Sequence, residues 1–143
     1  MIYLDTSALI KLVVLETNTD LTWGLVSADD VATSRITWAE ARAALARRER
    51  DAPASAENWR QARAHLGDLW RRFKIIEVTQ PVVVLAGDYA ETFALRGFDA
   101  VQLASADLAK GASPGAWTFL SFDIRLNRGA KLLALNLPEW AAV

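Results

Sequence analysis

The sequence contains no cysteine, a single histidine and no long uninterrupted apolar run. Without cysteine, disulfide bonds and thiolate metal sites are excluded, which fits a reducing compartment, and we expect a cytoplasmic protein. One histidine argues against catalysis by an acid/base pair of histidines. No apolar stretch approaches the roughly 20 residues that a membrane span needs, so no membrane association is expected. The apolar N-terminus lacks a basic leader and includes Asp5 and Lys11, so we interpret it as part of the folded domain.

The charge is nearly balanced overall but unevenly distributed along the chain. The length of 143 residues suits one domain spanning 1–143, and 52% hydrophobic with 23% charged residues predicts a folded core. The formal net charge is -1, yet residues 35–74 contain ten Arg/Lys and five Asp/Glu. That segment therefore carries +5 and the remainder -6. Such asymmetry either steers a polyanion toward one face or reflects two solvated helix faces.

Strand-like and helix-like segments alternate, which is typical of an α/β domain with a mostly parallel sheet flanked by helices. We expect strands at 1–5, 31–34, 75–78 and 117–121, and a short additional strand at 134–137. Helices are expected at 7–16, 19–27, 37–50, 55–73, 81–96, 99–110 and 123–133. The helices at 37–50 and 55–73, separated by Asp51-Ala52-Pro53, predict a helical hairpin that carries the basic excess.

Two of these helices have clear boundary signals. The run Thr37-Trp38-Ala39-Glu40 has the spacing of a capping box, in which Thr37 and Glu40 bond reciprocally to the backbone at the helix start. Pro81 suits the first turn of its helix, and Gly97 suits the position just after the end of that helix.

Four acidic residues, Asp5, Glu40, Asp99 and Asp123, lie where a strand or loop leads into a helix. Because the carboxyl ends of parallel strands open onto one edge of a sheet, these side chains can converge. Converging carboxylates raise one another's pKa unless a cation lies between them. Oxygen ligands without cysteine predict Mg²⁺, with Mn²⁺ as a substitute. The alternative is structural: Asp5, Asp99 and Asp123 as helix N-caps, and Glu40 as the capping-box partner.

Other polar residues lie near these acids in the sequence. Ser7 and Ser121 are two residues from Asp5 and Asp123, so their hydroxyls could orient the carboxylates, contact phosphate or cap locally. Asn127 follows Asp123 at i+4 and could face the same site. His65 lies beside the apolar stripe of the second hairpin helix, where a structural role is favoured over metal binding.

Four segments, taken in order, resemble the acidic motifs of PIN-domain ribonucleases: YLDTSALIKL at 3–12, TWAEARAALAR at 37–47, LRGFDAVQLASA at 95–106 and FLSFDIRLNRGA at 119–130. As a whole the chain resembles the VapC toxins of bacterial and archaeal toxin–antitoxin pairs. Residues 16–18 differ from the Glu-Pro-Gly-like turn of many relatives, which affects a loop, and Ser121 stands where Thr is frequent. The resemblance implies a PIN-like three-layer fold.

The resemblance also implies a metal-dependent endoribonuclease. Asp5, Asp99 and Asp123 would hold one or two Mg²⁺ ions, with Glu40 acting directly or through water, and metal-activated water would cleave the phosphodiester bond. Products would carry 5′-phosphate and 3′-hydroxyl ends. The expected partners are single-stranded or looped RNA, a second copy in a homodimer and a VapB-like antitoxin that blocks the active site. Three hairpin arginines are predicted to contact RNA phosphates: Arg42, Arg47 and Arg48.

Two other functions remain open on the sequence. One is a non-catalytic PIN-type domain that binds RNA or acts as a scaffold, against which the intact set of acids argues. The other is an aspartyl-phosphate phosphatase with Asp5 as the nucleophile, since an acid that ends an apolar strand near Mg²⁺ is also typical of those enzymes. The second acid usual in such phosphatases is absent, because Ser7 occupies its position.

Overall fold

Four short parallel strands form the central sheet of the protein. The structure is a computed structural model that describes residues 1–143, except the side chain of residue 54. The strands are β1 (Ile2–Leu4), β2 (Val31–Ser34), β3 (Lys74–Ile76) and β4 (Thr118–Leu120), in the order β3-β2-β1-β4. Their registers align Leu4 with Thr33 on one side and with Leu120 on the other. Because every pairing between these strands is parallel, their carboxyl ends meet at one edge.

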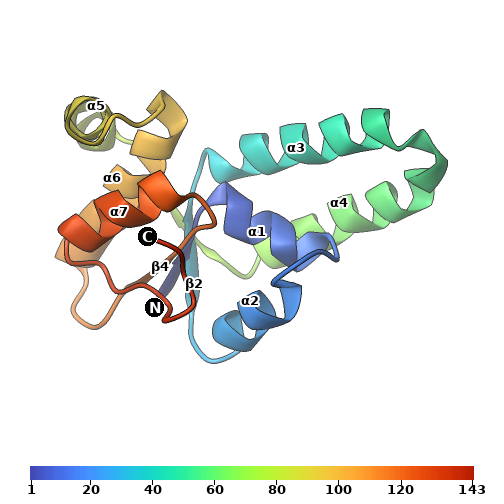
Figure 1. The fold of residues 1–143 in the computed structure, drawn as a ribbon, viewed down its shortest axis with the longest axis horizontal. Helices are drawn as coiled ribbons and strands as arrows, with labels where there is room; N and C mark the ends of the chain where they lie inside the picture. Colours follow the sequence, from blue (N-terminus) through green and yellow to red (C-terminus); the bar gives the residue numbers. More distant parts are fainter.

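The described residues form seven α-helices, which surround the sheet (Figure 1). They are α1 (Thr6–Val13), α2 (Thr19–Val26), α3 (Thr37–Asp51), α4 (Ala56–Trp70), α5 (Gln80–Phe93), α6 (Gly97–Ala112) and α7 (Ile124–Leu132). Figure 1 shows α3 and α4 projecting from one side of the molecule, whereas α5, α6 and α7 lie on the other. The short 3-10 helix η1 (Pro53–Ser55) joins the two hairpin helices, as the predicted break requires.

Two hydrophobic cores lie against opposite faces of the sheet. Ile2 and Leu4 point into a core built with α1, α3 and α4, whereas Tyr3 points into a core built with α6 and α7. This division follows from the strand, in which successive side chains face opposite ways. The predicted three-layer α/β architecture with a parallel sheet and a protruding hairpin is therefore confirmed (Figure 1).

Two of the predicted helix caps are present. Asp5 is the N-cap of α1 and accepts a hydrogen bond of 2.9 Å from the Ala8 N–H. Asp123 is the N-cap of α7 and accepts from the Arg125 N–H at 2.8 Å. Each residue lies between the end of a strand and the start of a helix: Asp5 directly follows β1, and Asp123 follows β4 after two residues. The cap therefore holds each carboxylate at the carboxyl edge of the sheet.

The predicted capping box is wrong. Helix α3 begins at Thr37, but its N-cap is Ile36 and none of the described side chains caps this end. The Thr37 hydroxyl instead accepts hydrogen bonds from the Thr33 hydroxyl at 2.8 Å and from the Gln102 amide at 2.9 Å. The Thr37 side chain therefore forms tertiary hydrogen bonds and does not cap the helix.

Two further boundary predictions are wrong. Gly97 does not close the helix that starts near Pro81, because α5 ends at Phe93 and Ala94 takes the left-handed conformation with φ of 51°. Gly97 is the first residue of α6, so Asp99 lies in the first turn and Arg96 is the N-cap. The short strand expected at 134–137 is reduced to one isolated bridge between Thr118 and Asn136.

Among the helices described, none combines the length and the apolar character that crossing a membrane requires.

Candidate active site

Asp5 lies at the centre of the carboxyl edge, immediately after the strand β1. Its side chain is 5% exposed, and its N–H donates to the Leu120 carbonyl at 3.1 Å, which ties it to the neighbouring strand. The Ser7 hydroxyl donates to the carboxylate at 2.7 Å, and the Ser121 hydroxyl donates to Oδ2 at 2.7 Å. With the Ala8 N–H, three donors occupy about three of the four acceptor positions of a carboxylate, so about one position remains for another ligand.

The environment of Asp5 favours a proton or a cation beside it. The pKa of this carboxyl is raised from its ordinary value of 3.8 to about 6, mainly by burial and to a smaller extent by the charge of Glu40. The hydrogen bonds from Ala8, Ser121 and Ser7 act in the opposite direction and hold the pKa down. Burial is the largest effect, so an ionised Asp5 is costly until positive charge is supplied.

A cavity of about 500 Å³ brings all four predicted acids together. It is also lined by Ser7, Arg47 and Arg48, which the sequence singled out, and by Lys11, Glu16, Arg96 and Gln102 among others. The acids come from the start of four different helices, which the parallel sheet gathers at one edge. The convergence expected from the sequence is therefore present in the fold.

Asp99 lies close enough to Asp123 and Glu40 to be affected by their charges. Partial burial raises the pKa of Asp99, and the charges of Asp123 and Glu40 raise it as well. Arg96 and Arg125 lower it, since each places a positive charge nearby. Two of the four carboxyls thus have raised pKa values, a pattern found where acidic groups are gathered for chemistry rather than for surface solubility.

Gln102 is a site residue that the sequence reasoning missed. It lies on α6 one turn after Asp99, is 2% exposed, and its Nε2 donates to Glu40 Oε2 at 2.8 Å. The Thr6 hydroxyl donates to the same Glu40 oxygen. The available signal was a lone amide among the apolar residues of α6, spaced i+3 from Asp99 and so on the same face.

The orientation of Gln102 is set by Tyr3. The Tyr3 hydroxyl donates to Gln102 Oε1 at 2.8 Å, and burial raises the pKa of Tyr3, which keeps that proton in place. The amide nitrogen must therefore face Glu40 and Thr37. Among the described residues no hydrogen bond reaches Glu40 Oε1, so Glu40 has one committed oxygen and one uncommitted oxygen.

The donor set suits a hard cation held by few protein ligands. Among the described residues, no group of three or more Asp, Glu or His side chains stands ready to hold one ion together. Mg²⁺ usually keeps several waters and binds proteins through one or two carboxylates. Asp5, with its raised pKa and an acceptor position still open, and the mutually repelling Asp99 and Asp123 fit that mode of binding.

The remaining predicted residues are divided between the cavity and its surroundings. Ser121 is buried beneath the cavity, and its carbonyl accepts from Asn127 Nδ2 at 3.2 Å. Asn127 is buried, donates also to the Ala142 carbonyl at 2.8 Å and does not line the cavity. It therefore connects the backbone next to the site with the C-terminal segment. Arg42 does not line the cavity either, because it lies over the Trp38 ring at 5.6 Å.

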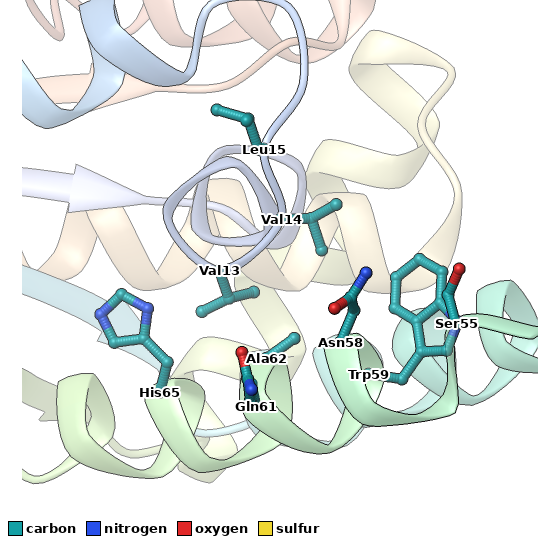
Figure 2. A pocket seen from close by; sticks show the side chains of 9 residues that line it. All are labelled: Val13, Val14, Leu15, Ser55, Asn58, Trp59, Gln61, Ala62 and His65. Atoms are coloured by element: carbon teal, nitrogen blue, oxygen red, sulfur yellow. The ribbon is translucent and has the colours of Figure 1, made fainter.

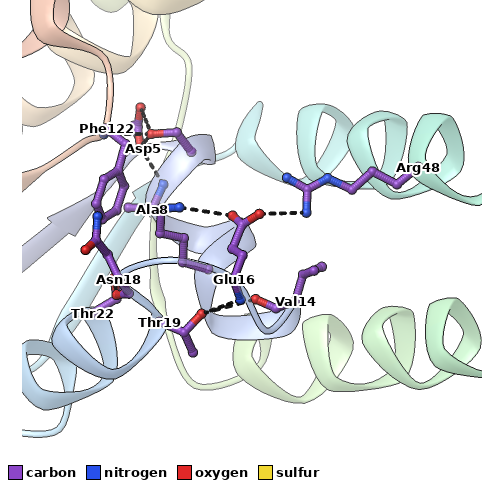
Figure 3. A network of polar contacts seen from close by, with 11 residues as sticks. Asp5, Ala8, Val14, Glu16, Asn18, Thr19, Thr22, Arg48 and Phe122 are labelled. Carbon is purple, nitrogen blue, oxygen red and sulfur yellow. Dashed lines mark hydrogen bonds and ion pairs between the residues drawn. The ribbon is translucent and has the colours of Figure 1, made fainter. Parts of the chain in front are cut away.

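Arg48 reaches the cavity through an ion pair. Its guanidinium lies 3.2 Å from Glu16 Oε2, and Lys11 Nζ lies 3.1 Å from Glu16 Oε1. Figure 3 shows Glu16 at the loop after α1, with Arg48 extending toward it from α3. Glu16 is thus paired with two positive side chains, Lys11 and Arg48, and all three line the cavity.

A second groove of about 620 Å³ lies between the end of α1 and α4 (Figure 2). Val13, Val14 and Trp59 line it with His65, and no Asp or Glu is among its described lining residues. His65 stacks on Trp23 with ring centroids 5.7 Å apart, which agrees with the structural role that the sequence favoured. This groove therefore offers no carboxylate from its described lining residues to a cation.

Comparisons with known proteins agree with this geometry. The model of the PIN domain family matches residues 2–132. The chain is 39% identical over 131 residues to Ribonuclease VapC45 of Mycobacterium tuberculosis, covering 91% of this chain and 89% of that protein. Its fold resembles that of VapC20 of M. tuberculosis, described as a sarcin-ricin loop cleaving toxin, with a TM-score of 0.65, 17% identity and coverage of 90% and 94%.

A further structure with the same fold is VapBC2 from Rickettsia felis bound to a DNA fragment from their promoter, with a TM-score of 0.63, 18% identity and coverage of 96% of this chain and 98% of that chain. These two structural likenesses support the fold, and the identity of the curated relative together with the matched family model supports the family. The chain therefore belongs to the PIN-domain family and, within it, to the VapC ribonucleases.

Proposed function

We propose that the chain is a Mg²⁺-dependent endoribonuclease and the toxin of a toxin–antitoxin pair. The observation that carries the proposal is the single cavity in which Asp5, Glu40, Asp99 and Asp123 converge. Its two raised carboxyl pKa values favour a bound cation, and the relative with 39% identity is named a ribonuclease. A cation bound among these carboxylates would offset the negative charge of a phosphodiester during cleavage.

In this proposal Asp5, Asp99 and Asp123 hold one or two ions, each ion bound by one or two of these carboxylates and otherwise by water, and Glu40 contributes directly or through water. Bound Mg²⁺ would offset the charge of the scissile phosphate and make a coordinated water more acidic. The side chains of Ser7 and Ser121 fix the Asp5 carboxylate in one orientation. Glu40 Oε1, which accepts no hydrogen bond from the described residues, is available to a water or an ion.

The reaction would be a hydrolysis with direct attack on phosphorus. The products would carry 5′-phosphate and 3′-hydroxyl ends, because the attacking oxygen joins the phosphate and the 3′-oxygen leaves with a proton. The ribose 2′-OH takes no part in the attack, so preference for RNA would come from binding. Arg47 and Arg96 line the cavity and would contact phosphates beside the cleaved one.

The proposed partner in the cell is an antitoxin. The fold is shared with VapBC2 from Rickettsia felis and with a structure described as a toxin-antitoxin complex from Klebsiella pneumoniae. A peptide that occupies the acidic cavity would block access of RNA to the four acids. A homodimer of this chain stays a prediction.

Cleavage of a structured RNA panel by the purified protein tests the proposal. Mg²⁺ or Mn²⁺ should support cleavage, EDTA should stop it, and ligation-based mapping should find 5′-phosphate ends. Asp99→Asn should abolish cleavage and the growth arrest caused by expression, because loss of a ligand costs several kcal/mol of barrier. The matched control is Asp88→Asn, the same change at an exposed position on α5.

Full activity in EDTA or in the Asp99→Asn variant would refute the metal-dependent mechanism. RNA binding without cleavage under every metal condition would support the non-catalytic scaffold instead. Trapping of a phosphate group on Asp5 would indicate a phosphatase-type reaction. Circular dichroism on each variant separates these results from loss of the fold.

A further inference from the structure

We propose that Lys11 and Arg48 form a phosphate subsite beside the acidic centre, and that Glu16 occupies this subsite in the free protein in place of an RNA phosphate. The inference rests on the proposed function as a ribonuclease and adds to it. It assigns to Glu16 the role of an internal competitor of the substrate.

The geometry is that of one anion bound by two cations. Glu16 Oε1 lies 3.1 Å from Lys11 Nζ, and Glu16 Oε2 lies 3.2 Å from a guanidinium nitrogen of Arg48 (Figure 3). Each carboxylate oxygen thus faces a different cation, one from α1 and one from α3. A phosphodiester also presents two charged oxygens on one centre, so it can replace the carboxylate between the same two groups.

The position of the two cations suits a phosphate that flanks the cleaved one. Lys11 follows Asp5 by six residues along α1, which corresponds to about 9 Å of helix. Arg48 follows Glu40 by eight residues along α3, about 12 Å. All of these residues line the same cavity, so an RNA strand that enters it passes both the acids and the cations.

Glu16 can leave without disturbing the fold. Its backbone is fixed, because its N–H donates to Thr19 Oγ1 at 3.0 Å and its carbonyl accepts from the Thr19 N–H at 3.1 Å. Its side chain is 29% exposed, and that of Arg48 is 33% exposed. Ion pairs that are partly in water are weak, so a competing anion can open this one by rotation of a single side chain.

Lys11 remains in place when Glu16 leaves. Its ammonium lies over the Phe122 ring, 4.5 Å from the centroid, and its side chain is only 14% exposed. Phe122 is itself held by a stacking contact with Trp140 and by its N–H, which donates to the Ser7 hydroxyl at 2.9 Å. The positive group is therefore preorganised for a phosphate, which limits the entropy lost on binding.

The charged residues that line the cavity set Glu16 apart from the other acids. Five acids and four bases line it: Asp5, Glu16, Glu40, Asp99 and Asp123 against Lys11, Arg47, Arg48 and Arg96. Four of the acids belong to the proposed metal centre. Glu16 is the fifth, and it alone among them is paired with two of the cations.

A purely structural clamp predicts a different result from a phosphate subsite. If the three side chains only tie the loop after α1 to the hairpin, removing any one of them loosens the same contact, and RNA affinity changes in one direction. If Glu16 competes with phosphate, its removal strengthens RNA binding, whereas removal of Lys11 or Arg48 weakens it. The sign of the change therefore separates the two explanations.

The test uses the full chain with Glu16→Gln, Lys11→Met and Arg48→Met. Binding of a labelled single-stranded oligouridine of about 12 nucleotides is measured by fluorescence anisotropy in EDTA at low salt, where cleavage is stopped. The KM for cleavage of the same RNA is measured in Mg²⁺. The matched control is Glu49→Gln, which makes the same charge change and breaks a similar pair with Arg63, 2.7 Å long, on the hairpin.

Glu16→Gln should lower the Kd and the KM by about threefold to tenfold with kcat unchanged, and Glu49→Gln should have a clearly smaller effect. Lys11→Met and Arg48→Met should raise both constants, and each should reduce the salt dependence of log Kd by about 0.7. Equal Kd and KM for Glu16→Gln and Glu49→Gln, or weaker binding in Glu16→Gln, would overturn the subsite while the ribonuclease function stands. A wild-type protein that neither binds nor cleaves RNA would overturn both.

Discussion

Replacing Asp5 by Asn should make the metal-free protein more stable at neutral pH and less stable in acid. Asp5 is 5% exposed, and burial raises its pKa from 3.8 to about 6. Asn keeps the size of the side chain but removes its charge. The comparison of wild type with Asp5→Asn therefore isolates the cost of burying an ionised carboxyl at the carboxyl edge of the sheet.

The sign follows from the proton balance of Asp5. Between about pH 4 and pH 6 the native state holds a proton that the unfolded chain has released, so the free energy of unfolding falls as pH rises through this window. The rise in pKa corresponds to a total loss of about 3 kcal/mol, complete above the folded-state pKa. Asn avoids this loss at every pH, but its amide NH2 takes the place of the oxygen that accepts from the Ser121 hydroxyl, and the loss of this hydrogen bond costs about 1 kcal/mol.

The expected result is a crossover. In EDTA at about pH 4 the variant should be less stable by about 1 kcal/mol, and at neutral pH more stable by about 2 kcal/mol. At about 3 °C per kcal/mol, the melting temperature at neutral pH should rise by about 6 °C. Mg²⁺ should stabilise the wild type and act more weakly on the variant, because Asp5 is a proposed ligand.

Urea unfolding followed by circular dichroism across this pH range measures the difference. Asp88→Asn provides the control, since Asp88 is exposed on α5 and its replacement makes the same chemical change without burial. A pH-independent difference for Asp5→Asn would refute the buried-charge reasoning. A magnesium response equal to that of the wild type would remove Asp5 from the ligands.

Three further predictions concern other parts of the chain. Gln102→Leu should slow cleavage about tenfold and cost about 1–3 kcal/mol of stability, measured by single-turnover kinetics and urea unfolding, because Glu40 and the buried hydroxyls lose a donor. Ala94→Gly should raise the free energy of unfolding by about 0.5–1 kcal/mol by relieving the left-handed φ of 51°, whereas Ala90→Gly within α5 should lower it by about 1 kcal/mol. Arg47→Ala, on the cavity wall, should weaken RNA binding in anisotropy titrations more than Arg42→Ala, and a larger effect of Arg42→Ala would contradict the assigned RNA path.

The sequence predicted the layers and the convergence of acids because both depend on simple periodic signals. Short apolar strands alternating with helices allow few arrangements other than a parallel sheet covered by helices. Asp5 and Asp123 each follow a strand, so their caps and their place at the sheet edge follow together. These predictions need only local sequence and the common direction of the strands.

The boundaries that were predicted wrongly are those where tertiary contacts prevail over local preference. Thr37 has the spacing of a capping box, but its hydroxyl is buried between Thr33 and Gln102 and bonds to them. Gly97 is a favourable residue for ending a helix, yet the chain turns at Ala94 because α5 and α6 pack against each other over much of their length. Local propensities are small beside such packing energies.

Gln102 shows why part of the site is invisible in the sequence. Its role depends on Tyr3, Thr37 and Glu40, which lie 62 to 99 residues away along the chain, so no short motif contains the network. Its consequence is nevertheless specific, because Tyr3 fixes the amide and the amide fixes one oxygen of Glu40. Glu40 therefore presents a single uncommitted oxygen to the cavity. This oxygen can bind one water or coordinate an ion in a monodentate way, whereas bidentate coordination by both oxygens of Glu40 is disfavoured.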